Sequence, residues 1–288
     1  MPRPNTSRII AGYDGSVPAG AALEVAARLS PSADASIAYA WAPPFASEPL
    51  RRRLWHGTRN VNDFVAAIER EGDAEARRLA AVGVTLARAY GWSATPVVER
   101  ESGAEGLELA RIAGRLKADL LVVGARGLGG ARAVLGSVSD MAVHYSPCPV
   151  LVVPYPLLVS ERLALAEGPV LAGWDGSPCA AAAALAAARL FPGREVVPAF
   201  VRDGDEPTGS PPEGLVSLPR HGTGMEHGRS IAAALIGQAR SRGAALIVVG
   251  SLGRSAPQEI LLGSVAMATL HHAYRPVLVV PRGPDQEP

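Results

Sequence analysis

The most constraining feature of the sequence is that its strand-like segments occur twice, in the same order. The repeated blocks are IIAGYDGS and VLAGWDGS (9–16 and 170–177), LLVVG and LIVVG (120–124 and 246–250), LGSV (135–138 and 262–265) and PVLVVP (149–154 and 276–281). Four blocks repeated in order predict two copies of one folding unit within the chain.

Length and composition agree with a pair of globular domains. At roughly 150 residues per domain, the 288 residues suffice for two. The 48% hydrophobic and 19% charged composition is that of a folded protein with its own cores. We expect an N-terminal domain over residues 1–156 and a C-terminal domain over residues 168–288, with a short linker near residues 155–167.

The charge balance argues against two classes of partner. Lys and Arg total 28 and Asp and Glu total 27, so the net charge of +1 attracts the chain neither to nucleic acid nor to a membrane surface. Cys148 and Cys179 have neither a disulfide framework nor metal-ligand spacing, and we expect small buried hydrophobes. The first residues lack the apolar stretch of a signal peptide. A cytoplasmic location is the expectation.

Short aliphatic runs alternate with helical patterns in each copy. In the first copy, the expected strands cover residues 8–13, 36–41, 95–99, 118–124 and 150–154. Runs without polar alternation suit strands that are buried on both faces of a parallel sheet. The predicted fold class is therefore α/β, with two doubly wound, Rossmann-like, five-stranded parallel domains in tandem.

The second copy is shorter than the first. The offset between copies falls from 161 residues at Asp14 and Asp175 to 126 at Gly124 and Gly250, a loss of 35 residues. The first copy has an amphipathic helical pattern over residues 61–90, whereas residues 203–212 of the second copy have loop composition. We predict that the second domain lacks one helix.

A glycine-rich loop follows the fourth strand of each copy. Its residues are Gly124, Gly127, Gly136 and Ser137 in the first copy, and Gly250, Gly253, Gly263 and Ser264 in the second. Such glycines let the backbone approach a ligand, and the N–H groups of a helix start favour phosphate. The pattern G-x2-G-x9-G-S is neither a Walker loop nor G-x-G-x-x-G. Tight strand-to-helix turns are the alternative interpretation.

An aspartate ends the first strand of each copy. In a doubly wound sheet, ligands bind beyond the carboxyl ends of the strands where the strand order reverses. If the first and fourth strands meet at that reversal, Asp14 faces Gly124 and Gly127, and Asp175 faces Gly250 and Gly253. A carboxylate there accepts hydrogen bonds from a base or a ribose. The alternative is an aspartate that helps the following serine to cap the next helix.

These motifs resemble those of the universal stress proteins in their tandem two-domain form. The Gly-x-Asp-Gly-Ser opening, the glycine loop and the Pro-Val-Leu-Val-Val-Pro ending carry the resemblance over nearly the whole chain. It implies an adenine nucleotide alpha hydrolase-like sheet of order 3-2-1-4-5 and the family branch that binds ATP. The implied nucleotide contacts are Asp14, Ala40, Val123, Gly124, Gly127, Gly136, Ser137 and Val138 in one copy, and Asp175, Ala199, Val249, Gly250, Gly253, Gly263, Ser264 and Val265 in the other.

Each copy departs from the family pattern. Eight residues separate Gly127 from Gly136 where the family has nine, and the second copy lacks a helix beside its adenine side. The resemblance also implies that the last strands, residues 150–153 and 277–280, pair edge to edge as an internal pseudo-dimer, which could dimerise again. Two edge strands covered by loops are the alternative.

Three functions follow, in order of preference. The first is a nucleotide-responsive stress-response module that binds ATP and an unidentified protein partner; the second is a nucleotide-free scaffold. The third is a slow Mg²⁺-dependent ATPase or nucleotidyl-transfer protein, which ranks last because no positioned general base or arginine finger is identifiable, although Arg126, Arg132 and Arg254 lie in or beside the glycine loops. Ser137, Ser139 and Ser264 have no paired His and carboxylate at a readable spacing, so we do not expect nucleophilic catalysis. We expect no metal ligand at His271 or His272. Residues 51–53, all Arg, form a solvated face or, alternatively, contact a triphosphate or an acidic partner.

Overall fold

The computed structural model describes residues 7–45, 47–101, 103–125, 135–202, 211–220, 227–253 and 262–282. Its strands are β1 (Ser7–Gly12), β2 (Ala33–Trp41), β3 (Ser93–Arg100), β4 (Leu120–Gly124), β5 (Val150–Val153), β6 (Val170–Gly173), β7 (Val196–Arg202), β8 (Val216–Pro219), β9 (Leu246–Gly250) and β10 (Val277–Val280). Its helices are α1 (Val17–Leu29), α2 (Glu48–Trp55), α3 (Val61–Ala89), α4 (Glu105–Arg115), α5 (Ser137–Tyr145), α6 (Val159–Glu167), α7 (Pro178–Leu190), α8 (His227–Ser241) and α9 (Ser264–His272).

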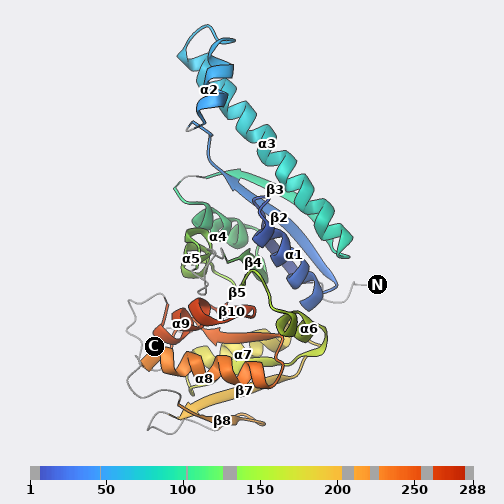
Figure 1. The fold of residues 1–288 in the computed structure, drawn as a ribbon, viewed down its shortest axis with the longest axis vertical. Coiled ribbons are helices and arrows are strands. Elements are labelled where there is room, and N and C mark those ends of the chain that lie inside the picture. Colours follow the sequence, from blue (N-terminus) through green and yellow to red (C-terminus); the bar gives the residue numbers. More distant parts are fainter. Residues whose placement is uncertain are drawn as a thin grey trace.

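All of these strands belong to one sheet. Their order is β3-β2-β1-β4-β5-β10-β9-β6-β7-β8, which is the order 3-2-1-4-5 followed by its mirror sequence (Figure 1). Every neighbouring pair is parallel except β5 and β10. The predicted fold class, two doubly wound α/β units in tandem, is confirmed. In each unit the strand order reverses between the first and fourth strands.

The strands lack polar alternation because neighbouring residues of a strand face two different hydrophobic cores. Ile9 faces a core formed with α1, α3 and α7, while Ile10 faces a second core formed with α4, α5, α8 and α9. Both cores run through the two halves: Leu278 of β10 belongs to the first and Val279 to the second. The sheet is therefore buried on both faces along its length, as a parallel sheet between helix layers requires.

Local sequence chemistry begins the helices that follow the first strand of each unit. Ser16 and Ser177 are the N-caps of α1 and α7, and their side chains accept hydrogen bonds from Ala19 N and Ala180 N. Proline stands in the first turn of both helices, where its missing N–H costs no hydrogen bond. The helix start predicted at Ser177 is confirmed.

The two units differ between their second and third strands. In the first unit, α2 and the 29-residue α3 connect β2 to β3. In the second unit only 13 residues connect β7 to β8, too few for a counterpart of α3; residues 203–210 of them lie outside the described residues. The second unit therefore lacks a helix, as the shorter sequence predicted.

The two units join along their last strands. β5 and β10 pair antiparallel, with Val152 opposite Val277 and Leu151 opposite Leu278. The edge-to-edge pseudo-dimer is thus present within one chain, and the alternative of loop-covered edges is wrong.

The segment expected as a short linker contains a helix. Within α6, Glu161 and Leu165 are buried. Arg275, 3% exposed before β10, donates from Nη2 to Glu161 Oε1 at 3.2 Å. Among the described residues, no helix is both long and apolar enough to cross a bilayer.

Candidate nucleotide site

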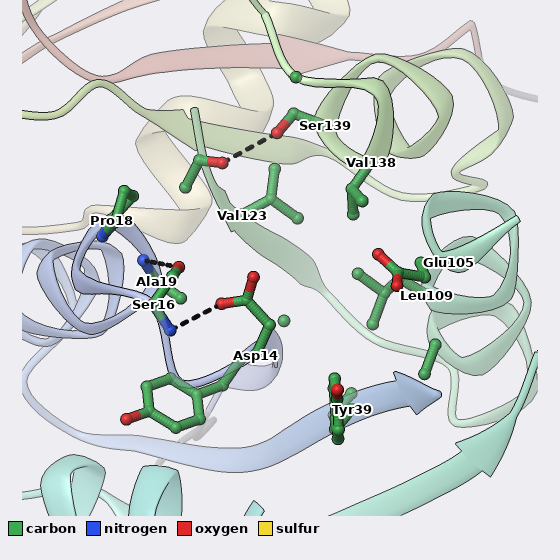
Figure 2. A pocket seen from close by; sticks show the side chains of 16 residues that line it. Asp14, Ser16, Pro18, Ala19, Tyr39, Glu105, Leu109, Val123, Val138 and Ser139 are labelled. Atoms are coloured by element: carbon green, nitrogen blue, oxygen red, sulfur yellow. Dashed lines mark hydrogen bonds between the residues drawn. The ribbon is translucent and has the colours of Figure 1, made fainter. Parts of the chain in front are cut away.

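A cavity opens at the carboxyl ends of β1, β2 and β4, where the first unit reverses its strand order. It holds about 570 Å³ of empty space, counting the part open to solvent. The residues that line it are Gly12, Tyr13, Asp14, Ser16, Pro18, Ala19, Ala38, Tyr39, Ala40, Glu105, Leu109, Val123, Gly124, Gly136, Val138 and Ser139. Figure 2 shows that they come from both helix layers as well as from the sheet. This is the position at which doubly wound folds bind ligands.

Asp14 has a structural contact as well as an exposed oxygen. Its Oδ1 accepts a hydrogen bond from Ser16 N at 3.0 Å, an Asx turn that leads into α1. Gly15 between them has a φ of +82°, a left-handed conformation that glycine adopts without strain. Figure 2 shows the other carboxylate oxygen turned away from Ser16 toward Val123. One carboxylate oxygen of Asp14 therefore makes the turn that leads into α1, while the other can contact a ligand.

Gly124 lets two backbone segments meet at the cavity. An added Cβ there would lie 2.7 Å from Pro18 O, so a side chain would push α1 away from β4. Ser139 Oγ donates to Gly124 O at 2.9 Å and ties the first turn of α5 to the end of β4. The glycine is therefore required by packing, which is the turn interpretation, and it also shapes the cavity wall.

The N-terminus of α5 borders the same cavity. Its N-cap is Gly136, which has no side chain with which to cap the free N–H groups of the first turn. These groups and the helix dipole favour an anion. α9 begins in the same way in the second unit, with Gly263 as its N-cap.

Acidic and phenolic groups gather on the other side of the cavity. Glu105, in the first turn of α4, lies across the cavity from α1 (Figure 2). Burial raises the pKa of Tyr39, and nearby carboxylates, Glu105 first and then Asp14, raise it further. Burial and the Asp14 carboxylate also raise the pKa of Tyr13. Both phenols are protonated at neutral pH and are hydrogen-bond donors.

The structure brings together most of the residues that were predicted for the first copy. Those that line the cavity are Asp14, Ala40, Val123, Gly124, Gly136 and Val138. Ser137 is the first residue of α5, beside them. Gly127 lies outside the described residues, as do Arg126 and Arg132.

The described ends of the corresponding loop in the second copy are joined by a hydrogen bond. Gly263 N donates to Ser251 O at 2.7 Å, so the two ends of the loop are bonded directly. Asp175 Oδ1 accepts from Ser177 N at 2.9 Å, and its Oδ2 lies 3.0 Å from the position of an added Cβ at Gly253. Asp175 therefore faces Gly253, as the sequence predicted.

The other predicted residues of the second copy lie nearby in the fold. Val249 and Gly250 end β9, and Ser264 and Val265 begin α9. An added Cβ at Gly250 would lie 3.0 Å from atoms of Cys179, so this glycine, like Gly124, permits close packing of a strand end against a helix start.

Ala40 and Ala199 are not structurally equivalent positions in the two units. Ala40 and Ala199 were expected to be equivalent residues at the ends of the second strands. However, Ala199 pairs with Gly173 as Ala38 pairs with Gly12, and Trp174 N donates to Ala199 O as Tyr13 N does to Ala38 O. The counterpart of Ala40 is therefore Val201, two residues further on. Without a repeated motif on these strands, the sequence did not set their register.

Five polar or aromatic residues of the cavity were not among the contacts predicted from the sequence: Tyr13, Ser16, Tyr39, Glu105 and Ser139. Tyr13 stands next to Asp14 in the repeated block, and Ser139 lies in the first turn of α5, so both were within reach of the motifs. Glu105 follows the third strand, whose carboxyl end meets the same edge of the sheet. The position of Glu105 after the third strand was the only feature of the sequence that indicated it as a cavity residue.

The fold and this cavity define a tandem pair of Rossmann-type α/β units joined as a pseudo-dimer, with a candidate ligand site at a strand reversal. The family model described as "Universal stress protein family" matches residues 5–154 and 219–281. Because the match covers most of the chain and reaches both halves, the chain belongs to the universal stress protein family.

Two further comparisons bear on relatives and fold. Universal stress protein Sll1654 of Synechocystis sp. (strain ATCC 27184 / PCC 6803 / Kazusa) is 45% identical over 62 residues, which are 21% of this chain and 39% of that protein. The chain thus spans about two fifths of the length of this curated relative.

Among solved structures, a universal stress protein from Archaeoglobus fulgidus DSM 4304 has a TM-score of 0.69 at 17% identity and covers 97% of this chain and 100% of its own. A functionally unknown protein from Pseudomonas aeruginosa PAO1 has a TM-score of 0.58 at 14% identity, with 96% and 93% covered. At such identities the likeness shows the fold, here over both halves.

Proposed function

We propose that the chain binds ATP in the cavity of its first unit and acts as a nucleotide-responsive module of a stress response. The observation that carries the proposal is the shared cavity of Asp14, at the end of β1, and the N-terminus of α5. These two features offer opposite chemistry to one ligand. A nucleotide suits this pair of features, because its base and ribose donate hydrogen bonds at one end and its phosphates carry negative charge at the other.

The hydrogen-bond donors and acceptors of the cavity support a single orientation of the bound nucleotide. The carboxylates of Asp14 and Glu105 accept hydrogen bonds from ribose hydroxyls or a base amino group, and they repel phosphate. The N-terminus of α5 attracts phosphate, and Gly136 keeps that approach free of side-chain atoms. Apolar residues of the cavity, Leu109 and Val123 among them, suit the faces of a base.

We assign the nucleotide to the first unit rather than the second. In the second unit, Gly263 N already donates to Ser251 O, so this N–H is not available to a phosphate. Asp175 Oδ2 lies 3.0 Å from the position that a Cβ on Gly253 would take, so there is no room for a side chain at Gly253 in the same region. We propose that ATP binds as its Mg²⁺ complex.

The test is an ATP titration by calorimetry in the presence of Mg²⁺, on the wild type and on two matched variants, Gly136→Asp and Gly263→Asp. Both glycines are N-caps with ordinary extended conformations, φ −72° and −73°. Aspartate is a favoured N-cap, so each variant places a carboxylate at the anion site without removing the helix start. An added Cβ at Gly263 would lie 3.3 Å from Ser251 O, which requires a small local shift, so circular dichroism is used to verify the fold of both variants. We expect Gly136→Asp to lose the binding heat and Gly263→Asp to retain it.

Other outcomes of the titration support a different site or a different function. Loss of binding in Gly263→Asp alone assigns the site to the second unit. A folded wild type with neither heat nor thermal shift at millimolar ATP contradicts the proposal and favours the nucleotide-free scaffold. Turnover of ATP in excess of the protein concentration favours the ATPase.

A further inference from the structure

The connection between β2 and β3 contains an arm that extends beyond the sheet (Figure 1). α3 meets the sheet at Gly72, where an added Cβ would lie 2.6 Å from the Trp41 ring. Residues 61–71 precede that contact, and at 1.5 Å per residue they account for about 16 Å of helix. α2 lies against this part of α3 and contains no buried residue. We call residues 48–71 the arm.

The sheet does not depend on the arm. The second unit makes the equivalent parallel pair, β7 with β8, across a connection of 13 residues. The arm therefore needs an explanation other than completion of the fold.

An open groove lies on the arm. It holds about 730 Å³ of empty space, counting its open side, and its lining residues are Glu48, Arg51, Arg52, Trp55, His56 and Phe64. The rings of Trp55 and Phe64 meet edge to face, with centroids 5.1 Å apart and an interplanar angle of 82°. Trp55 is nevertheless 53% exposed. An aromatic side chain that is held in place and still accessible is a common anchor of binding surfaces.

The charge beside this groove is positive. Residues 49–62 contain four arginines and no Asp or Glu, and they are flanked by Glu48 and Asp63. Two of the arginines are neutralised within the arm, Arg52 by Glu48 and Arg53 by Glu71. Arg51 and Arg59 have no ion pair with any described residue.

Some charged residues elsewhere on α3 have partners. Asp73 and Glu75, past the arm, are paired with Arg77 and Arg78, and Glu69 is paired with Arg100 of β3. Arg70 and Arg88 of α3 also have no ion pair with a described residue, so unpaired arginines are not confined to the tip of the arm; Arg51 is the unpaired arginine that lines the groove.

We propose that this groove binds an acidic peptide segment of a partner protein. An aromatic or aliphatic side chain of the segment packs on Trp55, and an Asp or Glu of the segment pairs with Arg51. A concave groove suits a peptide better than it suits a flat bilayer. Glu48 inside the groove also favours a peptide, because a peptide can place its carboxylates away from Glu48 whereas an anionic lipid surface cannot. The proposal does not depend on nucleotide binding.

The test is a selection from a phage-displayed library of random 12-residue peptides, with the full chain as bait. The subtracting bait is the double variant Arg51→Gln/Trp55→Ala. Both side chains are exposed and α2 buries nothing, so this variant folds, which circular dichroism verifies. We expect enriched peptides to carry a net negative charge and at least one aromatic or large aliphatic residue.

Affinities of the enriched peptides then locate the site. Isothermal titration calorimetry, rather than tryptophan fluorescence, measures the affinity of every variant, because Trp55→Ala has no tryptophan in the groove and Trp174 elsewhere in the chain is also partly exposed. Loss of one exposed ion pair weakens binding about two- to fivefold and loss of an aromatic anchor about tenfold or more, so we expect Arg51→Gln and Trp55→Ala to differ in this way. The matched control, Arg78→Gln, removes an arginine of α3 that lies outside the groove and leaves the affinity unchanged.

Three results overturn the proposal. One is a failure to enrich any peptide over the double variant, and another is enrichment of peptides with no acidic bias. The third is co-sedimentation with phosphatidylglycerol vesicles that Arg51→Gln/Trp55→Ala abolishes, without peptide enrichment. That last result would assign the arm to a lipid surface.

Discussion

Removal of the Glu161 carboxylate is expected to destabilise the chain strongly, because it leaves a buried guanidinium without its counter-charge. The side chains of Glu161 and Arg275 are each 4% exposed, and Arg275 Nη2 lies 3.2 Å from Glu161 Oε1. Arg275 also donates to the backbone oxygen of Ala244. Burial lowers the pKa of Arg275, while Glu161 acts in the opposite direction.

The magnitude follows from this geometry. Two unit charges 3.2 Å apart attract each other by about 5 kcal/mol at an effective dielectric constant of about 20. The retained hydrogen bond to Ala244 offsets part of the loss in Glu161→Ala, so about 3–5 kcal/mol is expected. Arginine cannot release its proton to relieve the burial. Replacement of both partners, Glu161→Met with Arg275→Met, removes both charges and should recover most of the stability.

Urea unfolding followed by circular dichroism measures these free energies for Glu161→Ala, and for a thermodynamic cycle made of Glu161→Met, Arg275→Met and their double variant. A loss below about 1 kcal/mol in Glu161→Ala would show that the pair is solvated and of little weight, as surface pairs are. A double variant no more stable than Glu161→Ala would refute the argument that an uncompensated charge is the cause.

Three further predictions concern the junction, a cap and a buried thiol. Leu151→Ala, at a fully buried residue opposite Leu278, should cost about 2–5 kcal/mol in urea unfolding and should weaken both halves in one transition; two separate transitions would contradict a single cooperative sheet. Ser177→Ala removes the hydrogen bond to Ala180 N and should cost about 1 kcal/mol, with no change of m-value. Burial raises the pKa of Cys148, so its contribution to stability is complete below the pKa of the unfolded thiol, about 8.5, and is lost as the pH rises from there through the folded pKa. Stability above pH 8.5 should fall less steeply in Cys148→Ala, and an unchanged slope would contradict this.

Local patterns determined most of the elements. The repeated blocks, the aliphatic runs without alternation and the serine caps at Ser16 and Ser177 act over a few residues each, so they are legible in the sequence. The same holds for the absent helix, because it is a matter of chain length. The glycines and Asp14 were found for the same reason, as parts of a short repeated motif.

Contacts between distant residues were decided only in the tertiary structure. Val201, and not Ala199, is the counterpart of Ala40. This register is set by hydrogen bonds between strands, and the burial pattern of the sequence does not reveal it because a shift of two residues keeps the same faces buried. Glu105 joins the cavity because α4 begins at the edge of the sheet where β1 ends. The groove on the arm likewise exists only in the tertiary structure, because it depends on how α2 packs against α3. Sequence fixes which residues can be buried or capped, while long-range packing decides which of them meet.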